Sequence, residues 1–241
     1  MLKIKNLRVT VEDKEVLRGV SFDVGKGEIV ALMGPNGSGK SSLSNAIMGN
    51  PNYEVVGGSV EYLGEDLSEL SVDERAKKGI MMAFQNPVAI NGVTVRELLL
   101  SSLRARGEKV SAVEVKNNIE KIAEELKMDR ELLSRGVNEG FSGGEKKKLE
   151  VLQMKLLSPR LLILDEVDSG LDIDALKTIA SSVKKQVKQK EMSVLVITHY
   201  QRLLKYLVPD RVVVLKEGRV VDMGGGEIVE KLEKEGYKSY E

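Results

Sequence analysis

One glycine-rich segment constrains the fold more than any other part of the chain. It follows an apolar run from Ile29 to Met33 and precedes a segment with helical character. Its residues, in order, are Gly34, Pro35, Asn36, Gly37, Ser38, Gly39, Lys40, Ser41 and Ser42. An apolar run, a glycine-rich turn and a helix start predict a buried strand, a phosphate-binding loop and a helix.

The residue types in this loop suit a polyphosphate. Glycines let consecutive backbone N–H groups turn toward an anion, and the helix N-terminus adds partial positive charge. Lys40 would reach the terminal phosphates, and the Ser41 hydroxyl would take one Mg²⁺ coordination position. The structural alternative is a flexible turn that contains a lysine by chance. The position between strand and helix favours the phosphate-binding interpretation.

Length and composition exclude several classes of protein. A chain of 241 residues can bury a sizeable core, and we expect a main body with an attached lobe. The 37 basic residues balance the 37 acidic ones, so nucleic acid is not an expected partner. The absence of cysteine excludes disulfides and thiolate-bound zinc or iron–sulfur clusters. Without a membrane-length apolar run or signal peptide, the sequence predicts a cytoplasmic protein that is not itself inserted in a membrane.

The order of apolar runs predicts an α/β fold. Leu2 to Val9 and Val20 to Val24 alternate like an antiparallel strand pair. Further short strands are expected at Ser59–Leu63, Ile80–Phe84, Leu161–Leu164, Val194–Ile197 and Val212–Leu215. Strands alternating with helices predict a mainly parallel sheet covered on both faces. The sequence is helical from Thr94 to Leu157, a candidate helical lobe, and a surface helix is expected at Glu227–Glu235.

Two carboxylates follow one of the predicted strands. Asp165 and Glu166 come directly after Leu161–Leu164, at the carboxyl end where ligands bind in open parallel sheets. Asp165 would hold Mg²⁺ directly or through its water shell, and Glu166 would polarise a water in line with the terminal phosphate. A solvated acidic turn after a strand is the structural alternative. The phosphate-binding loop upstream favours the catalytic interpretation.

A second anion-binding helix start is expected after Phe141. Ser142, Gly143, Gly144 and Glu145 open the segment that continues through Leu156. Ser142 and Glu145 have the capping-box spacing, so a purely structural helix start competes with a functional one. The cap does not explain two adjacent glycines in the first turn, which are poor helix formers. Their backbone N–H groups would be open to a second phosphate contact.

Taken in order, these motifs resemble those of the ATP-binding-cassette (ABC) ATPases over essentially the whole chain. The ordered set is the phosphate loop, Gln85, Ser142 to Glu145, Asp165-Glu166, Ser169-Gly170-Leu171-Asp172, and His199. The resemblance implies a P-loop (RecA-like) ABC nucleotide-binding domain. Residues 1–85 and 160–241 would form the body with an antiparallel β subdomain, and residues 86–159 would form the helical subdomain.

The resemblance also implies how the site works. Two copies would form a transient, ATP-dependent head-to-tail homodimer, in which the loop of one and Ser142 to Gly144 of the other hold the same γ-phosphate. Gln85 would contact Mg²⁺ and the attacking water and report to the helical subdomain. His199, expected near Asp165, would contact the γ-phosphate, although a lone histidine is more often structural. Asp172 would link the two sites across the interface.

Departures from the common pattern narrow the resemblance. The resemblance implies an aromatic ring that stacks on adenine a few residues before Val16, but none is present. We therefore expect aliphatic side chains to contact adenine, with weaker selectivity for adenine over guanine. Phe141, Glu145 and Val167-Asp168 replace the commoner Leu, Gln and Pro-Thr. The residues at these positions, together with the segments 83–88 and 198–202, are similar to those of the ATPases of the SUF iron–sulfur cluster assembly system. That resemblance implies partners of the SufB type, and possibly of the SufD type.

Two other functions remain open from the sequence. The same chemistry would serve the ATP-binding subunit of a membrane ABC importer. Only the partner protein would distinguish that function from the SUF function. A DNA-repair or chromosome-organising ATPase would carry a long coiled-coil insertion between the loop and the second glycine motif. No sustained heptad run of that size is present.

Overall fold

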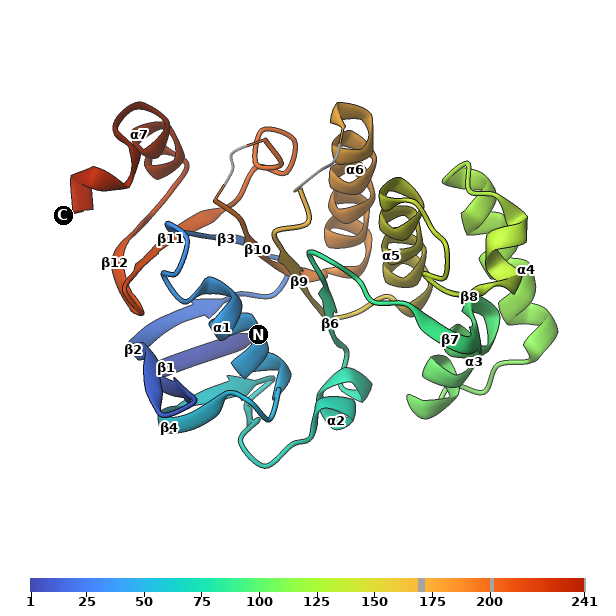
Figure 1. Ribbon diagram of the computed structural model, residues 1–241, viewed down its shortest axis with the longest axis horizontal. Helices are drawn as coiled ribbons and strands as arrows, with labels where there is room; N and C mark the ends of the chain where they lie inside the picture. Colours follow the sequence, from blue (N-terminus) through green and yellow to red (C-terminus); the bar gives the residue numbers. More distant parts are fainter. Residues whose placement is uncertain (169–171, 200–201, 241) are drawn as a thin grey trace.

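The central element of the computed structural model is a six-stranded sheet with the order β12-β11-β3-β10-β9-β6 (Figure 1). Residues 1–168, 172–199 and 202–240 are described, so Ser169–Leu171, part of one predicted motif, lie outside the described residues. The strands of the six-stranded sheet are β3 (Ile29–Met33), β6 (Ile80–Ala83), β9 (Leu161–Asp165), β10 (Ser193–Ile197), β11 (Arg211–Lys216) and β12 (Arg219–Gly224). Only β12 runs antiparallel to its neighbour. The predicted parallel sheet is confirmed.

The strand register brings the predicted site residues to one edge. Ile197 of β10 lies opposite Leu32 of β3 and Asp165 of β9. The residues that follow these strands therefore emerge side by side at the carboxyl ends. Helix α1 (Lys40–Met48) begins directly after the loop that follows β3.

The predicted antiparallel subdomain is present as a second sheet. Strands β1 (Leu2–Val11), β2 (Lys14–Val24), β4 (Glu54–Tyr62) and β5 (Glu65–Asp66) pair in the order β2-β1-β4-β5. Strand β4 begins earlier than the expected start at Ser59. Gly58 lies at a register shift with a φ of 77°, where a Cβ would come within 2.3 Å of the Asn6 carbonyl oxygen. Gly57 and Gly58 therefore accommodate a bulge inside the strand.

The segment from 94 to 157 is only partly helical. It contains α3 (Val95–Ala105), α4 (Ala112–Glu125) and α5 (Gly143–Leu157), with a 3-10 turn at Arg130–Ser134. The prediction of an all-helical segment is wrong at β8 (Gly136–Val137), which pairs with β7 (Ile90–Thr94). The Ile90 carbonyl lies 3.1 Å from where a Gly136 Cβ would be, so glycine permits this close approach. The boundaries of the helical subdomain stay a prediction.

Both faces of the central sheet are buried. Along β3, Ile29, Ala31 and Met33 face one apolar cluster, which includes residues of α3, α4, α5 and α6 (Ile173–Lys190). Val30 and Leu32 face the other cluster, which includes residues of α1 and the second sheet. The short helix α2 (Val72–Lys77) lies between β5 and β6 in the chain. Helix α7 spans the predicted Glu227–Glu235 and precedes a 3-10 segment at Gly236–Tyr240.

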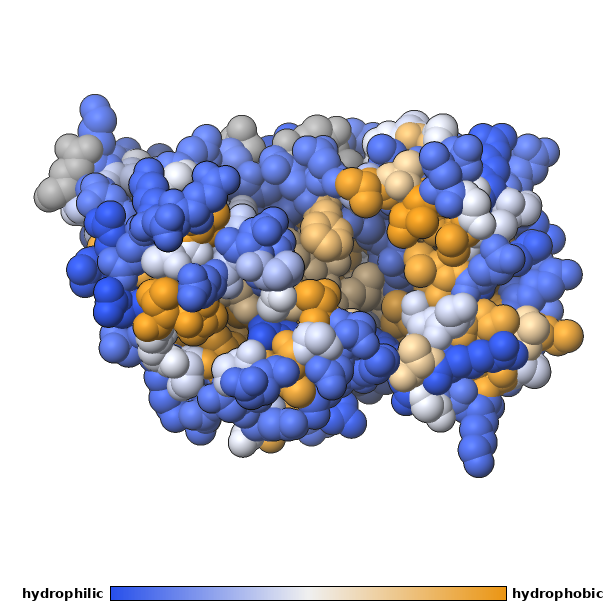
Figure 2. Space-filling view, turned by 60° about the horizontal axis from the view of Figure 1, so that its bottom comes forward, coloured by the Kyte–Doolittle hydropathy of each residue, from blue (hydrophilic) through white to orange (hydrophobic). Residues whose placement is uncertain are grey.

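One face of the molecule is mainly polar. Figure 2 shows charged and polar side chains over most of one face, with apolar side chains gathered in patches (Figure 2). Across the described ranges, no helix is long and apolar enough to cross a membrane.

Candidate functional site

A cavity of about 740 Å³ opens at the carboxyl ends of the central strands. This volume lies in the usual range for small-molecule sites, and the position is the one expected for open α/β sheets. Predicted site residues supply most of its lining: Asn36, Gly37, Gly39, Lys40, Ser41, Ser42, Gln85, Glu166 and His199. Lys14, Glu15, Val16, Arg18 and Glu217 complete it. The structure thus brings the loop and the predicted catalytic side chains together.

The loop between β3 and α1 depends on its glycines. A Cβ on Gly34 would lie 2.2 Å from the Leu215 carbonyl oxygen of β11, which only a glycine avoids. Gly39 has a φ of 104°, which side chains rarely adopt, and it ends the loop where α1 starts. Within the loop, the Ser38 hydroxyl is buried and has no hydrogen-bond partner among the described residues. These features fit a loop shaped to hold an anion.

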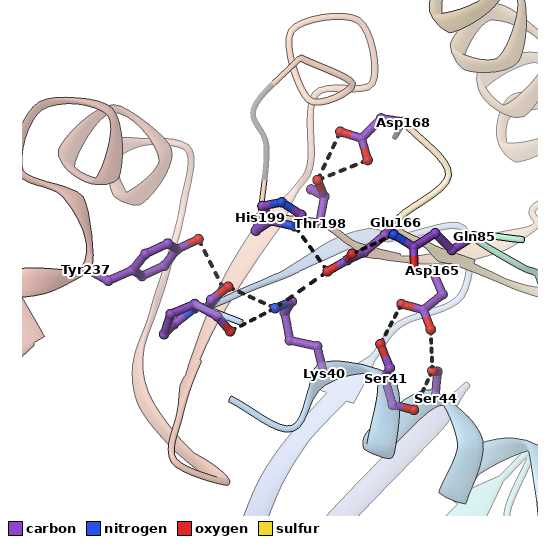
Figure 3. A network of polar contacts seen from close by, with 12 residues as sticks. Lys40, Ser41, Ser44, Gln85, Asp165, Glu166, Asp168, Thr198, His199 and Tyr237 are labelled. Carbon is purple, nitrogen blue, oxygen red and sulfur yellow. Dashed lines mark hydrogen bonds and ion pairs between the residues drawn. The ribbon is translucent and has the colours of Figure 1, made fainter. Parts of the chain in front are cut away.

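Lys40 is buried beneath the cavity and bound to the loop itself. Its ammonium donates to the carbonyl oxygens of Gly34 at 2.9 Å and Pro35 at 3.0 Å (Figure 3). The Glu166 carboxylate lies 3.8 Å away. Burial lowers the pKa of Lys40, and the negative charges of Glu166 and Asp165 oppose that shift. Lys40 is therefore a buried cation at the cavity, held by two loop carbonyls and close to the Glu166 carboxylate.

Asp165, at the end of β9, faces the first turn of α1. Its carboxylate accepts hydrogen bonds from the Ser41 hydroxyl at 3.2 Å and the Ser44 hydroxyl at 3.1 Å. Burial raises the pKa of Asp165, and the two serine hydrogen bonds oppose the shift. Hydroxyl and carboxylate oxygens are the ligands Mg²⁺ prefers, so these residues fit a magnesium ion. In the described part of the chain, no cluster of three acidic, His or Cys residues could hold a metal alone, so nucleotide and water would have to supply further ligands.

Glu166 lies at the centre of the polar network. Its carboxylate contacts the His199 Nδ1 at 3.1 Å and accepts from the Gln85 side-chain amide at 3.3 Å (Figure 3). Its backbone has a φ of 48°, which is uncommon for a residue other than glycine. Strained backbone of this kind clusters at functional sites. His199, expected near Asp165, lies against the adjacent residue Glu166.

Asp168 supports the site, whereas the sequence indicated it only as a departure from the common pattern. It is buried, and its carboxylate accepts from the Thr198 hydroxyl at 3.1 and 3.3 Å. Burial raises the pKa of Asp168, and the Thr198 hydrogen bonds oppose the shift. The contact joins the segment after β9 to the end of β10 and so helps fix Glu166 beside His199. Nothing in the local sequence around Asp168 indicates its distant partner.

The second predicted anion site is not part of the cavity. Ser142 and Glu145 form the capping box at the start of α5, where the Glu145 carboxylate accepts from the Ser142 backbone N–H at 2.7 Å. Gly143 and Gly144 are exposed, and an added Cβ would meet nothing within 4 Å at either position. The capping explanation is therefore correct for Ser142 and Glu145. Packing in the described structure does not explain why Gly143 and Gly144 are glycines, because a larger side chain would meet no neighbour at either position.

Asp172 also lies apart from the cavity. It caps α6, where its carboxylate accepts from the Ala175 backbone N–H at 2.7 Å. This local role accounts for an Asp at the position. Its predicted link to a second site stays a prediction.

A buried ion pair joins α5 to the residue before Gln85. Lys147 and Glu150 lie 2.8 Å apart, with 7% and 11% of their side chains exposed. Glu150 accepts the Phe84 backbone N–H at 2.9 Å, and Lys147 donates to the Phe84 carbonyl at 2.5 Å. Both backbone polar groups of Phe84 are thus held by one helix. This pair was not predicted, because its members look like surface charges in the sequence.

Comparisons with known proteins agree with this geometry. Residues 17–169 match the family model described as "ABC transporter". The chain is 51% identical to "Probable ATP-dependent transporter SufC" of Escherichia coli, over 98% of this chain and 97% of that protein. It is 49% identical to "Vegetative protein 296" of Bacillus subtilis, over 98% and 91% of the two chains. A solved "Structure of ATP binding subunit of ABC transporter" matches with a TM-score of 0.84 and 28% identity, over 100% of this chain and 99% of that one.

Proposed function

Because the chain belongs to the ABC ATPase family and is a SufC-like ATPase that binds and hydrolyses ATP, we propose that two copies close head to tail on ATP and thereby deform an iron–sulfur scaffold. The observation that carries this proposal is the exposed pair Gly143 and Gly144 at the tip of α5. Two open N–H groups at a helix start suit an anion. The cavity beside the loop lacks such a tip among its described lining residues, so a second copy would supply it.

The hydrolysis step follows from the side chains in the cavity. The loop N–H groups and Lys40 would bind the terminal phosphates, with the ammonium leaving the carbonyls of Gly34 and Pro35. Glu166, oriented by Gln85 and His199, would accept a proton from water as that water attacks the γ-phosphorus. The bond to the bridging oxygen breaks, which gives ADP and phosphate.

A magnesium ion would be held by Ser41, Asp165 and Gln85. When bound, it would supply positive charge that neutralises the negative charge of the phosphate oxygens. Ser42 lies in the same loop lining and would add to the phosphate contacts. Asp172 would sit near the interface between the two copies.

The closure model predicts complementation between two defective copies. Lys40→Ala should raise the KM for ATP about 10- to 100-fold, since an ammonium–phosphate contact is lost. Gly144→Val should block the anion approach without filling protein space, because the site around Gly144 is open. In an equal mixture of the two variants, random pairing makes half of the dimers mixed. Each mixed dimer has one intact site out of two, so a quarter of all sites are intact. About a quarter of the normal ATPase rate should therefore return.

The mixture is measured by phosphate release at a fixed total concentration. Each variant alone at the same concentration is the control for residual activity. A mixture no faster than the mean of the two variants would contradict a site shared between copies.

The partner is proposed from the relatives. Similarity to a SufC over nearly the whole chain supports a SufB-type scaffold, with a SufD-type protein where one is present, in the cytoplasm. Phe84 and Val88, 50% and 76% exposed, flank Gln85 and offer apolar surface that such a partner could cover. Isolation of the native complex should yield soluble partners that carry iron and sulfide.

A second candidate is the ATP-binding subunit of a membrane importer. It is favoured by other relatives, such as a 47% identical "Probable ABC transporter ATP-binding protein" of Streptococcus pyogenes. The same isolation decides between the two. Integral membrane proteins in the native complex would replace the scaffold proposal with the importer.

A further inference from the structure

The C-terminal segment reaches back to the phosphate loop. Helix α7 ends at Glu235, and Gly236, with a φ of 66°, turns the chain. The Tyr237 hydroxyl then accepts the backbone N–H of Gly34 at 3.2 Å. Figure 3 shows this ring pointing at the loop from the side opposite Gln85 and Asp165. The contact joins the first residue of the loop to one 203 positions later.

Separate contacts hold the segment in place. The Tyr240 hydroxyl donates to Asp222 at 2.6 Å, and the Tyr240 carbonyl accepts from the Lys216 ammonium at 3.0 Å. The Lys231 ammonium lies 4.5 Å from the centre of the Tyr240 ring. Asp222 and Lys216 belong to the hairpin β11–β12, and β11 pairs directly with β3. Tyr237 is therefore presented to the loop by the strands beside it.

Gly34 is restrained from several directions. On one side, the Leu215 carbonyl leaves no room for a Cβ. Its own carbonyl accepts from the Lys40 ammonium. The remaining backbone group, the N–H, belongs to a buried residue and is satisfied by Tyr237. Because a buried N–H without a partner is costly, loss of the hydroxyl should favour other loop conformations.

From these contacts we propose that Tyr237 is a positioning residue for ATP binding, whose hydroxyl fixes the first peptide of the phosphate loop. The proposal rests on the phosphate-binding role given to the loop under the proposed function. It assigns to the C-terminal segment a part in nucleotide affinity. Burial raises the pKa of the Tyr237 phenol, so the group stays neutral and suited to this contact at physiological pH.

Tyr237→Phe keeps the ring and removes the hydroxyl. The KM for ATP should rise about three- to tenfold, the range expected for one hydrogen bond, while kcat at saturating ATP stays within about twofold. Hydrogen exchange of the peptide containing Gly34 should become faster in the nucleotide-free variant. A residue that served only folding would lower the melting temperature without this selective change in KM and exchange.

Tyr62→Phe is the matched control. The Tyr62 hydroxyl, at the end of β4, donates to the Lys78 carbonyl at the end of α2 at 3.4 Å, so this variant also loses one tyrosine hydrogen bond. It should leave the KM for ATP unchanged. An unchanged KM and unchanged Gly34 exchange in Tyr237→Phe, with weakened binding in Lys40→Ala, would overturn the role of Tyr237 alone. Normal ATP binding in Lys40→Ala would overturn the assignment of the loop, and the Tyr237 proposal with it.

Discussion

Glu166→Gln should retain ATP binding while hydrolysis falls about 100- to 1000-fold, within the usual contribution of a general base. Glutamine has nearly the same shape as glutamate, and both hydrogen-bond partners of the carboxylate, Gln85 and His199, remain. The amide cannot accept the proton of the attacking water. An ATP-bound dimer should therefore accumulate, because closure no longer ends in hydrolysis.

Three measurements test this variant. Phosphate release gives the hydrolysis rate, nucleotide titration gives the affinity, and light scattering with and without ATP gives the oligomeric state. Glu69→Gln is the control, since Glu69 carries an exposed carboxylate and does not line the cavity. It should hydrolyse ATP within about twofold of normal, as surface substitutions usually do little. A normal rate in Glu166→Gln would show that another group activates the water.

The parts of the site that sequence reasoning found are those encoded locally. The loop before Lys40 has its own residue pattern, and Asp165 and Glu166 follow an apolar strand whose carboxyl end must lie at the site. Their convergence with His199 follows from parallel pairing of β9 and β10. Such features need only strand direction and order to be placed.

The parts that were missed depend on distant partners. Tyr237 is an ordinary aromatic near the C-terminus until folding brings it to Gly34. Asp168 has no visible role without Thr198. Lys14 and Arg18 line the cavity from strand β2 but carry no recognisable motif in the sequence. Long-range packing determines the role of each of these residues, so no local sequence pattern could have predicted it.

The contacts of Phe84 link the cavity to helix α5. Gln85 contacts Glu166, the proposed base, and the preceding residue is held by α5. The same helix begins with Gly143 and Gly144. A movement of α5 when two copies close would therefore displace the Phe84 backbone and, with it, Gln85. This connection depends on the buried pair Lys147 and Glu150.

Lys147→Met should destabilise the protein by about 3–5 kcal/mol, because it leaves the Glu150 carboxylate buried without its partner. The Phe84 carbonyl also loses its donor. Urea unfolding measures the loss. Lys77→Met is the surface control, since Lys77 pairs with Asp73 at the exposed start of α2; it should leave the urea midpoint unchanged.

The double variant Lys147→Met with Glu150→Gln separates the buried charge from the lost contact. It removes the unpaired carboxylate and keeps an acceptor for the Phe84 N–H, so it should recover most of the lost stability. Burial already raises the pKa of Glu150, and Lys147 opposes that shift. Without Lys147 the folded-state pKa rises further, so the defect of the single variant should grow as pH rises through that pKa and shrink as pH falls. A defect independent of pH, or a double variant no more stable than the single one, would mean that lost packing and not the stranded charge causes the instability.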